Sequence, residues 1–212
     1  DAVLDSVAAA ARQAGVPVAT GDTKVVERAR GDGLMLTTTG VGAVPDGADL
    51  RAGRIAASDL VIVTGRIAEH GLAILSARQH LAFETDIRSD AACLHALVGA
   101  MLNSGADIKF LRDPTRGGLA GVAADLAEDT GLTVEIDEPA IPLSNACRHA
   151  AEMLGLDPLI VANEGKAVAV VPEADAPAAL AACHAHPLGA DAAVVGRFVD
   201  RPEGGHAEQG GR

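Results

Sequence analysis

The sequence predicts a fold of mixed helices and strands, of the α+β class. Segments with apolar residues at helical spacing and short apolar runs typical of strands follow one another without strict alternation. Hydrophobic residues make up 49% and charged residues 22% of the 212 residues, which is typical of a soluble globular protein. Three Phe and no Tyr or Trp mean that the core must be aliphatic.

The first part of the chain predicts one helix and three strands. Residues 1–14 have a helical pattern with Gly15 as C-cap, and β-type runs follow at 16–20, 24–28 and 34–42. The loop-like stretch 44–53 is the best candidate for a domain boundary.

The second part of the chain predicts a longer block of mixed strands and helices. The expected strands are 59–65, 132–137 and 192–200, and residues 159–163 and 166–171 are expected to form a hairpin. Five helices are expected. The first covers 70–81, the second is capped by Ser89 and has an apolar stripe through Leu97 and Met101, and the third starts within 110–121 and ends at Gly131. The fourth runs from its cap Ser144 to Leu154, and the fifth starts at Pro177.

Charge and composition exclude several classes of function. A net charge of −12 and the near absence of aromatic residues argue against a nucleic-acid-binding protein. No apolar run reaches the roughly 18 residues that a membrane span needs. Cys93, Cys147 and Cys183 are too widely spaced for a disulfide framework or a zinc site, and they are consistent with a reducing cytoplasm.

The stretch FLRDPTRGGLAG, residues 110–121, has two interpretations. In one, it is an ordinary helix start with Asp113 as N-cap, Pro114 in the first turn, and Arg112 and Arg116 solvated. In the other, Gly117 and Gly118 let an anion approach the free N–H groups of the helix start, and Arg116 adds a bidentate contact to phosphate.

Three further segments carry candidate site residues. In TGDTKVV, Asp22 suits Mg²⁺, Thr23 could bind metal or phosphate, and Lys24 could contact phosphate, although a β-turn with a polar tip explains the same letters. The other candidates are Asn163 and Glu164 in ANEGK, where Glu164 could act as a base or simply belong to a hairpin turn, and His70 before Gly71. His70 could serve acid–base chemistry or contact phosphate, or it could be an ordinary loop or cap residue.

Taken in order, these motifs resemble one family. GDTKVV, GLMLTTTGVG, HGLAILSAR, RDPTRGGLA and LGLDPLIVANEGK look like the HypE family of hydrogenase maturation factors, from about residue 1 to 200. The wider superfamily includes aminoimidazole ribonucleotide synthetase, selenophosphate synthetase and thiamine-monophosphate kinase.

The resemblance implies a two-domain PurM-like fold that is truncated at both ends in this chain. Residues 1–47 would be the remnant of an N-terminal domain that binds ATP and forms the dimer, 48–200 a nearly complete C-terminal α/β domain, and 201–212 a disordered tail. The family's tail ends in a cysteine, whereas this chain ends at Arg212. Cys93, Cys147 and Cys183 lie in or beside expected core elements and could not replace it.

The resemblance also implies a reaction. A carbamoyltransferase, HypF, would load the tail thiol as a thiocarboxamide, and an ATP-dependent carbamoyl dehydratase (a lyase) would convert it to a thiocyanate. The cyanide would then pass to iron held by a HypC–HypD complex. Carried over to this chain, Asp22 and Thr23 belong to the ATP–Mg²⁺ site, Lys24 and Glu164 act on the thiocarboxamide, and the cleft is lined by Arg112, Asp113, Thr115, Arg116, Gly117 and Gly118.

Two other functions stay open at this point. The chain could belong to another ATP-dependent kinase or synthetase of the superfamily, of the selenophosphate synthetase or thiamine-monophosphate kinase type. It could also be a non-catalytic scaffold domain. In the dehydratase interpretation, the 212-residue piece alone is expected to be inactive, because part of the nucleotide site and the acceptor thiol are missing.

Overall fold

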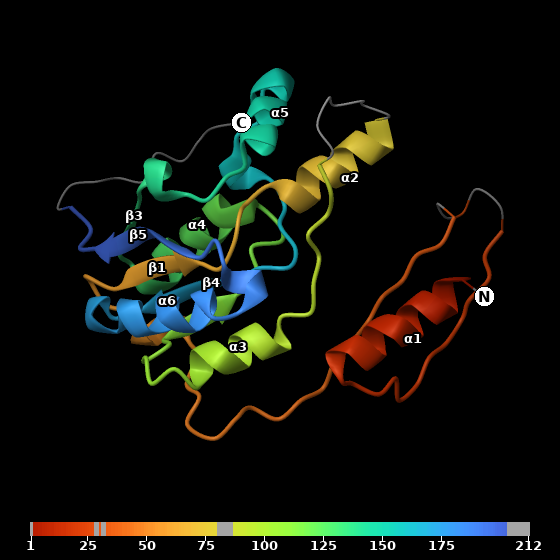
Figure 1. Cartoon of the computed structure of the whole chain (residues 1–212), viewed down its shortest axis with the longest axis horizontal. Helices are drawn as coiled ribbons and strands as arrows, with labels where there is room; N and C mark the ends of the chain where they lie inside the picture. The colour runs from red at the N-terminus through yellow and green to blue at the C-terminus, as the bar shows by residue number, and fades with distance from the viewer. Residues whose placement is uncertain (1, 28–29, 31–32, 80–86, 203–212) are drawn as a thin grey trace. The chain divides into compact units, whose positions relative to one another are not determined.

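The chain forms two compact units in the computed structural model, Asp1–Gly47 and Ala48–Arg212. The structure describes residues 2–27, 30, 33–79 and 87–202 (Figure 1). The predicted disordered tail, 201–212, therefore lies outside the described residues from position 203 onward.

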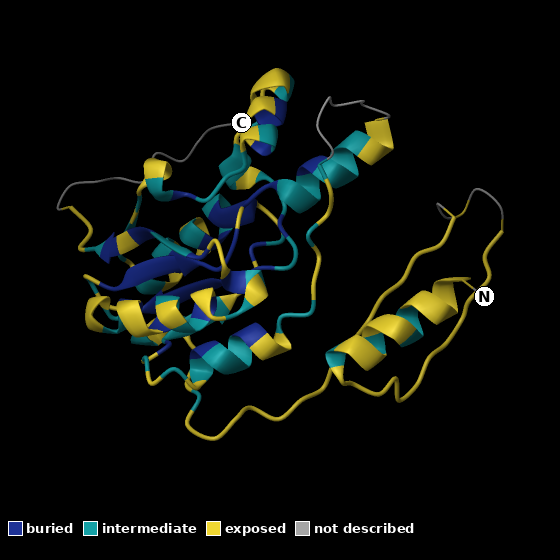
Figure 2. Ribbon diagram, in the orientation of Figure 1, coloured by how far each residue is buried: buried dark blue, intermediate teal, exposed yellow. Residues whose placement is uncertain are grey.

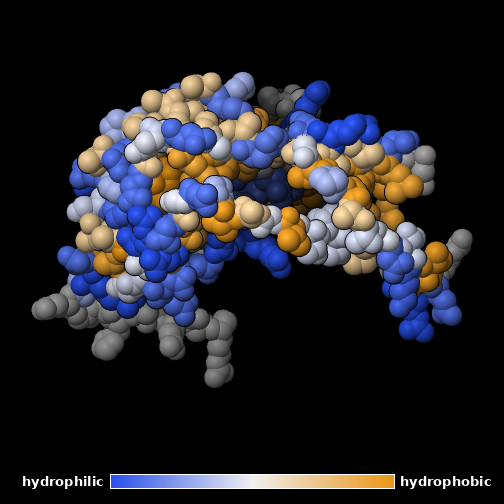
Figure 3. Space-filling view, turned by 90° about the horizontal axis from the view of Figure 1, so that it is seen from below, coloured by the Kyte–Doolittle hydropathy of each residue, from blue (hydrophilic) through white to orange (hydrophobic). Residues whose placement is uncertain are grey.

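The first unit contains helix α1, Ala2–Ala14, which ends at Gly15 with φ 69°, as predicted. The predicted strands at 16–20, 24–28 and 34–42 are wrong, because the described residues of these segments have no regular secondary structure. Strands need a paired neighbour for their backbone groups. Here the β-type side chains stay exposed instead, with Val25 90% and Val41 101% accessible, and part of this apolar surface is visible in Figure 3.

The second unit is built on a five-stranded antiparallel sheet. Its strands are β1 Leu60–Val63, β2 Phe110–Arg112, β3 Thr133–Ile136, β4 Val168–Val171 and β5 Ala193–Val199. They lie in the order β2-β4-β1-β5-β3, so β1 is central and β4 and β5 flank it (Figure 1). The prediction of an α+β fold is confirmed by this combination of helices with an antiparallel sheet.

Alternation along the central strands assigns their side chains to two cores. Val61 and Val63 face helix α4, Gly118–Thr130, through Leu119, Val122 and Leu126. Leu60 and Ile62 face the opposite side, where α3, His95–Leu102, and α6, Ala176–His184, cover the sheet. Because both faces are covered, β1 and β4 are buried at every position, as the dark blue strands in Figure 2 show.

A third, smaller core joins the two remaining helices. Leu72 of α2, Glu69–Gln79, packs with Cys147 and Ala150 of α5, Asn145–Leu154. Helix α5 has the ends that the sequence predicts, with the Ser144 side chain accepting from the Cys147 N–H and Gly155 as C-cap. Short 3₁₀ turns complete the unit: η1 Ala52–Arg54, η2 Glu138–Ala140, η3 Pro158–Ile160, η4 Glu173–Asp175 and η5 Pro187–Gly189.

Two local predictions for this unit are wrong, and tertiary contacts explain both. Ser89 does not cap a helix: α3 begins at His95, and the Ser89 hydroxyl bonds to His70 instead. Residues 159–163 do not pair with β4 as a hairpin, because Asp157 caps the 3₁₀ turn η3 and the Asn163 N–H donates to the Pro114 carbonyl.

A buried ion pair fixes one end of the sheet. Lys109, just before β2, donates from Nζ to both carboxylate oxygens of Asp59 at 2.8 Å, and Asp59 also accepts from the Ala56 N–H. Both side chains are largely buried, at 14% and 5% accessible. The pair joins the starts of β1 and β2, away from the loops that carry the candidate residues.

The helices that the structure describes include no candidate for a membrane span. None of them combines the length and the apolar character that a bilayer crossing requires.

Candidate functional site

The predicted site residues are divided between the two units. Asp22, Thr23 and Lys24 lie in the first unit, where all three are exposed. The Thr23 N–H donates to Asp22 Oδ1 at 2.8 Å, and the segment around them has neither a turn nor regular secondary structure. The remaining candidates lie in the second unit, at the end of the sheet where β1 ends and β4 begins.

Asn163 organises this end of the sheet. Its side chain is fully buried, and Oδ1 accepts from the Ala68 N–H at 2.7 Å. Its Nδ2 donates to the carbonyls of Pro114, at 3.2 Å, and Val161, at 2.9 Å. These bonds use the amide's acceptor and both of its donors, so Asn163 holds three segments together and has little capacity left for a ligand.

The bond from Ala68 has a conformational reason. Ala68 has φ 73°, a left-handed conformation that costs a residue with a Cβ roughly 1–2 kcal/mol. The Asn163 carbonyl satisfies the N–H that this conformation turns inward. The turn after β1 thereby places the start of α2, and with it His70, beside the segment that contains Ser89. His70 Nδ1 and Ser89 Oγ are 2.8 Å apart.

The RDPTRGG segment combines paired and unpaired polar groups. Arg112 ends β2 and forms an ion pair with Asp125 of α4, with Nη1 and Oδ2 2.6 Å apart. The Thr115 hydroxyl donates to the Asp113 carboxylate. The Arg116 guanidinium is exposed and has no hydrogen bond or ion pair within the described residues, so it is available to an external anion.

The helix that follows does not begin where the capping interpretation places it. Asp113 is not the N-cap, because α4 starts at Gly118 with Gly117 as N-cap at φ 75°. Gly118 itself has φ 62°, and a Cβ there would lie 2.3 Å from the Leu159 carbonyl oxygen. Gly118 is therefore required for α4 to approach the 159–161 segment, and Gly117 is exposed at the open end of the helix.

Glu164 follows the buried Asn163 in sequence. It is half-buried, and its carboxylate has no hydrogen bond or ion pair with any described residue. A carboxylate that is held in place but unpaired can accept a proton from a ligand. Together with the exposed Arg116 and the imidazole of His70, the second unit offers a base, a cation and a group for proton transfer around one set of loops.

Two residues of this region, Lys166 and Asp90, were not among the predicted site residues. Lys166 is 1% accessible, and its Nζ contacts the Asp90 carboxylate and the Glu164 carbonyl. Lys is rarely buried, so a single lysine after a turn glycine is expected at the surface. The Asp at position 90, adjacent to Ser89, was the only available hint.

No cluster of three or more His, Cys, Asp or Glu that could hold a metal ion occurs within the described residues. A resident metal centre of the all-protein kind is therefore not supported in this part of the chain. Mg²⁺ commonly takes one or two carboxylates together with substrate phosphates. The exposed Asp22 carboxylate fits that arrangement better than a closed protein site.

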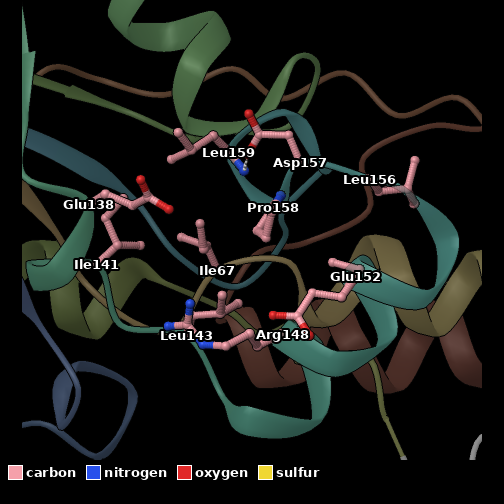
Figure 4. A pocket seen from close by; sticks show the side chains of 11 residues that line it. Ile67, Glu138, Ile141, Leu143, Arg148, Glu152, Leu156, Asp157, Pro158 and Leu159 are labelled. Carbon is pink, nitrogen blue, oxygen red and sulfur yellow. Dashed lines mark hydrogen bonds between the residues drawn. The ribbon is translucent and has the colours of Figure 1, made fainter.

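A pocket of about 170 Å³ lies beside these loops, on the side of α5 and η3 (Figure 4). Its apolar wall includes Ile67, next to Ala68, and Leu159, whose carbonyl contacts Gly118. Arg148 and Glu152, one turn apart on α5, project from another side. None of the predicted site residues lines it, so the pocket is separate from the Glu164 loop.

The cysteines show whether this chain could supply a reactive thiol. Burial raises the pKa of the Cys147 thiol, and it raises the pKa of Cys183 to about 11. Cys93 is half-buried, before α3. Cys147 and Cys183 are thus core residues, as the sequence indicated.

The fold and these motifs define the class of protein. Residues 56–207 match the family described as AIR synthase related protein, C-terminal domain, and the chain belongs to this family. Its sheet with covering helices is the PurM-like fold that the resemblance implied.

Within this family, the chain is similar to HypE proteins. It is 52% identical over 198 residues to the carbamoyl dehydratase HypE of Rhizobium leguminosarum bv. viciae, covering 93% of this chain and 57% of that protein. The crystal structure of E. coli HypE superposes with a TM-score of 0.87 at 41% identity, over 94% of this chain and 62% of that one. The resemblance to HypE is thereby confirmed, and the chain spans less than two thirds of the length of these relatives.

A solved structure of HypE in complex with ATP superposes with a TM-score of 0.83 at 39% identity, over 95% of this chain and 60% of that one. The chain is also similar to the HypE of a HypE–HypF complex, with a TM-score of 0.85, 36% identity, and coverage of 94% and 65%.

The close contact at Gly118 predicts that a Cβ methyl group at this position destabilises the fold. Gly118→Ala and Gly131→Ala place a Cβ at opposite ends of α4 at similar φ values, 62° and 71°, but a Cβ at position 131 meets nothing within 4 Å. Gly131→Ala should lower the free energy of unfolding by about 1–2 kcal/mol. Gly118→Ala should cost about 1–3 kcal/mol more through overpacking. Urea titrations of both variants check this, and equal losses would contradict the proposed contact.

The raised thiol pKa values predict selective labelling. At pH 8 about one in a thousand Cys183 side chains is a thiolate, against roughly one in four for a free cysteine. Iodoacetamide should therefore modify Cys93 first in the native protein, and all three cysteines equally in urea. Peptide mass spectrometry measures the extent of labelling. Rapid native labelling of Cys183 would refute the assignment.

Proposed function

We propose that the protein carrying this chain is an ATP-dependent carbamoyl dehydratase that makes the cyanide ligands of [NiFe]-hydrogenases. The observation that carries the proposal is Glu164, whose unpaired carboxylate extends from a rigid buried framework in a chain 52% identical to a carbamoyl dehydratase. The framework is the hydrogen-bonded Asn163 side chain on one side and Lys166 on the other.

The chemistry explains why such a residue is needed. In the thiocarboxamide R–S–C(=O)–NH₂ the oxygen is a poor leaving group. Transfer of the γ-phosphoryl group of ATP to this oxygen, with loss of one N–H proton, gives an imidate phosphate. Loss of the second N–H proton then expels phosphate and leaves R–S–C≡N. ATP and thiocarboxamide are thus converted to ADP, phosphate and thiocyanate with no other reactant.

The residues of this chain take distinct parts in that reaction. Glu164 accepts the N–H protons, and Lys24 stabilises the negative charge that develops at the carbamoyl oxygen. Arg116 and the open N-terminus of α4 at Gly117 bind phosphate oxygens. His70, beside Ser89, serves proton transfer or contacts phosphate.

ATP–Mg²⁺ fits the donors that the chain offers. Asp22 supplies a carboxylate and Thr23 a hydroxyl in an exposed segment, and Mg²⁺ is commonly bound by one or two carboxylates in combination with phosphates. Bound there, ATP would supply the phosphoryl group, and Mg²⁺ would offset the negative charge of the phosphates. The known ATP complex of a HypE supports this assignment.

The partners follow from the same proposal. HypF would supply the carbamoyl group, supported by the solved HypE–HypF complex, and a HypC–HypD complex would hold the iron that receives cyanide. The exposed apolar side chains of the first unit, such as Val25 and Met35, suit pairing with a second copy in a homodimer. The cytoplasm suits unpaired cysteines such as Cys147 and Cys183.

Glu164→Gln in the full-length protein tests the catalytic assignment. With the acceptor cysteine carbamoylated by HypF, substrate-dependent ADP release should fall about 10²–10⁴-fold, because general-base catalysis contributes that much. The affinity for ATP should stay within twofold. Lys24→Ala should also lower the rate, and mass spectrometry should show that thiocyanate is no longer formed.

Glu173→Gln is the matched control, because Glu173 is an exposed carboxylate of the same domain in the distant turn η4. It should keep wild-type turnover. Full activity of Glu164→Gln would refute the proposed function. ADP release driven by selenide or thiamine monophosphate would instead indicate a kinase or synthetase of the same superfamily.

A further inference from the structure

Lys166 is a fully buried lysine, and its surroundings are unusual. At 1% accessibility, its ammonium group contacts the Asp90 carboxylate and donates to the Glu164 carbonyl at 2.7 Å. Burying an ammonium group is costly unless the charge is paired and hydrogen-bonded. The contacts with Asp90 and Glu164 offset this cost and hold the ammonium group next to the turn that carries Glu164.

Main-chain packing reinforces the same contact. Gly165 has φ 65°, and a Cβ there would lie 1.9 Å from the Asp90 carbonyl oxygen. The Glu164–Gly165 turn therefore rests on the backbone of Asp90, while Lys166 reaches the Asp90 side chain. The Asp90 segment therefore meets the 164–166 turn twice, through the side chain of Lys166 and through the backbone of Gly165.

The Asp90 carboxylate in turn has Lys166 as its charged partner. Asp90 Oδ1 is buried and, within the described part of the chain, has no hydrogen-bond partner. The neighbouring Ser89 bonds to His70. The short segment 89–90 therefore connects two candidate site residues, His70 through Ser89 and Glu164 through Asp90 and Lys166.

We infer that Lys166 and Asp90 form a clamp that positions the Glu164 carboxylate for proton abstraction. This inference rests on the proposed function, in which Glu164 is the base. Lys166 holds the carbonyl of Glu164 and Asn163 holds the preceding residue, so the backbone of Glu164 is fixed from both sides. Displacement of a reacting group by about 1 Å can cost a hundredfold in rate, so such a clamp acts on catalysis without touching substrate.

The chain contains a matched pair that separates positioning from stability. Lys109 and Asp59 form the same kind of buried Lys–Asp pair, but at the opposite ends of β1 and β4, where no candidate residue lies. Loss of Lys109 leaves the buried Asp59 carboxylate without its cation, and loss of Lys166 does the same to the partly buried Asp90 carboxylate. The two substitutions should therefore destabilise the fold in the same way and differ only in their effect on Glu164.

Lys166→Met and Lys109→Met in the full-length carbamoylated protein test the clamp. Both should lower the urea midpoint to a similar extent. Below both midpoints, Lys166→Met should reduce kcat of substrate-dependent ADP release ten- to a hundredfold with KM for ATP within twofold. Lys109→Met should keep kcat within twofold. Asp90→Asn, which preserves shape, should lower kcat at least fivefold and serves if Lys166→Met does not fold.

A double variant separates an effect through Glu164 from an independent one. If Lys166 acts through Glu164, the Glu164→Gln/Lys166→Met protein should turn over as slowly as Glu164→Gln alone, measured in single-turnover experiments. Multiplicative losses, or a wild-type kcat for both Lys166→Met and Asp90→Asn beside an inactive Glu164→Gln, would overturn the clamp alone. A fully active Glu164→Gln would overturn the proposed function as well.

Discussion

The candidate site depends on the three hydrogen bonds of the buried Asn163 side chain. They join the turn after β1, the segment before α4 and the segment before β4, which are separated by up to 95 residues in sequence. An unsatisfied buried polar group costs about 1–3 kcal/mol, so each of the three segments stabilises the position of the other two. The direction of Glu164, the start of α4 and the left-handed Ala68 all follow from this arrangement.

Local signals predicted the elements whose ends are set by neighbouring residues. Ser144 and Gly155 define α5, and Gly131 ends α4, because a cap is formed by backbone groups within a few positions. The apolar run at 59–65 likewise predicted the buried strand β1. Such elements can be read from a single sequence because their energetics are local.

Elements that depend on distant partners could not be predicted in this way. Residues 16–20, 24–28 and 34–42 have strand-like side chains but no paired strand among the described residues of their unit. The helix predicted from Ser89 begins only at His95, because Ser89 bonds to His70 and Asp90 to Lys166. Of the residues in the proposed site, the motifs predicted Glu164 and Arg116. They missed Lys166 because a lysine becomes a buried residue only through an aspartate 76 positions away.

An acidic protein that binds polyphosphate must keep cations available without leaving them free to collapse onto its own carboxylates. The two arginines of the RDPTRGG segment do this differently. Arg116 is exposed and unpaired within the described residues, whereas Arg112 is paired with Asp125 while both side chains remain about half exposed. An exposed pair of this kind contributes only about 0–1 kcal/mol. Exchange of Asp125 for a phosphate oxygen would therefore cost little. Under the proposed function, Asp125 would hold Arg112 in the unliganded protein until a phosphate oxygen took its place.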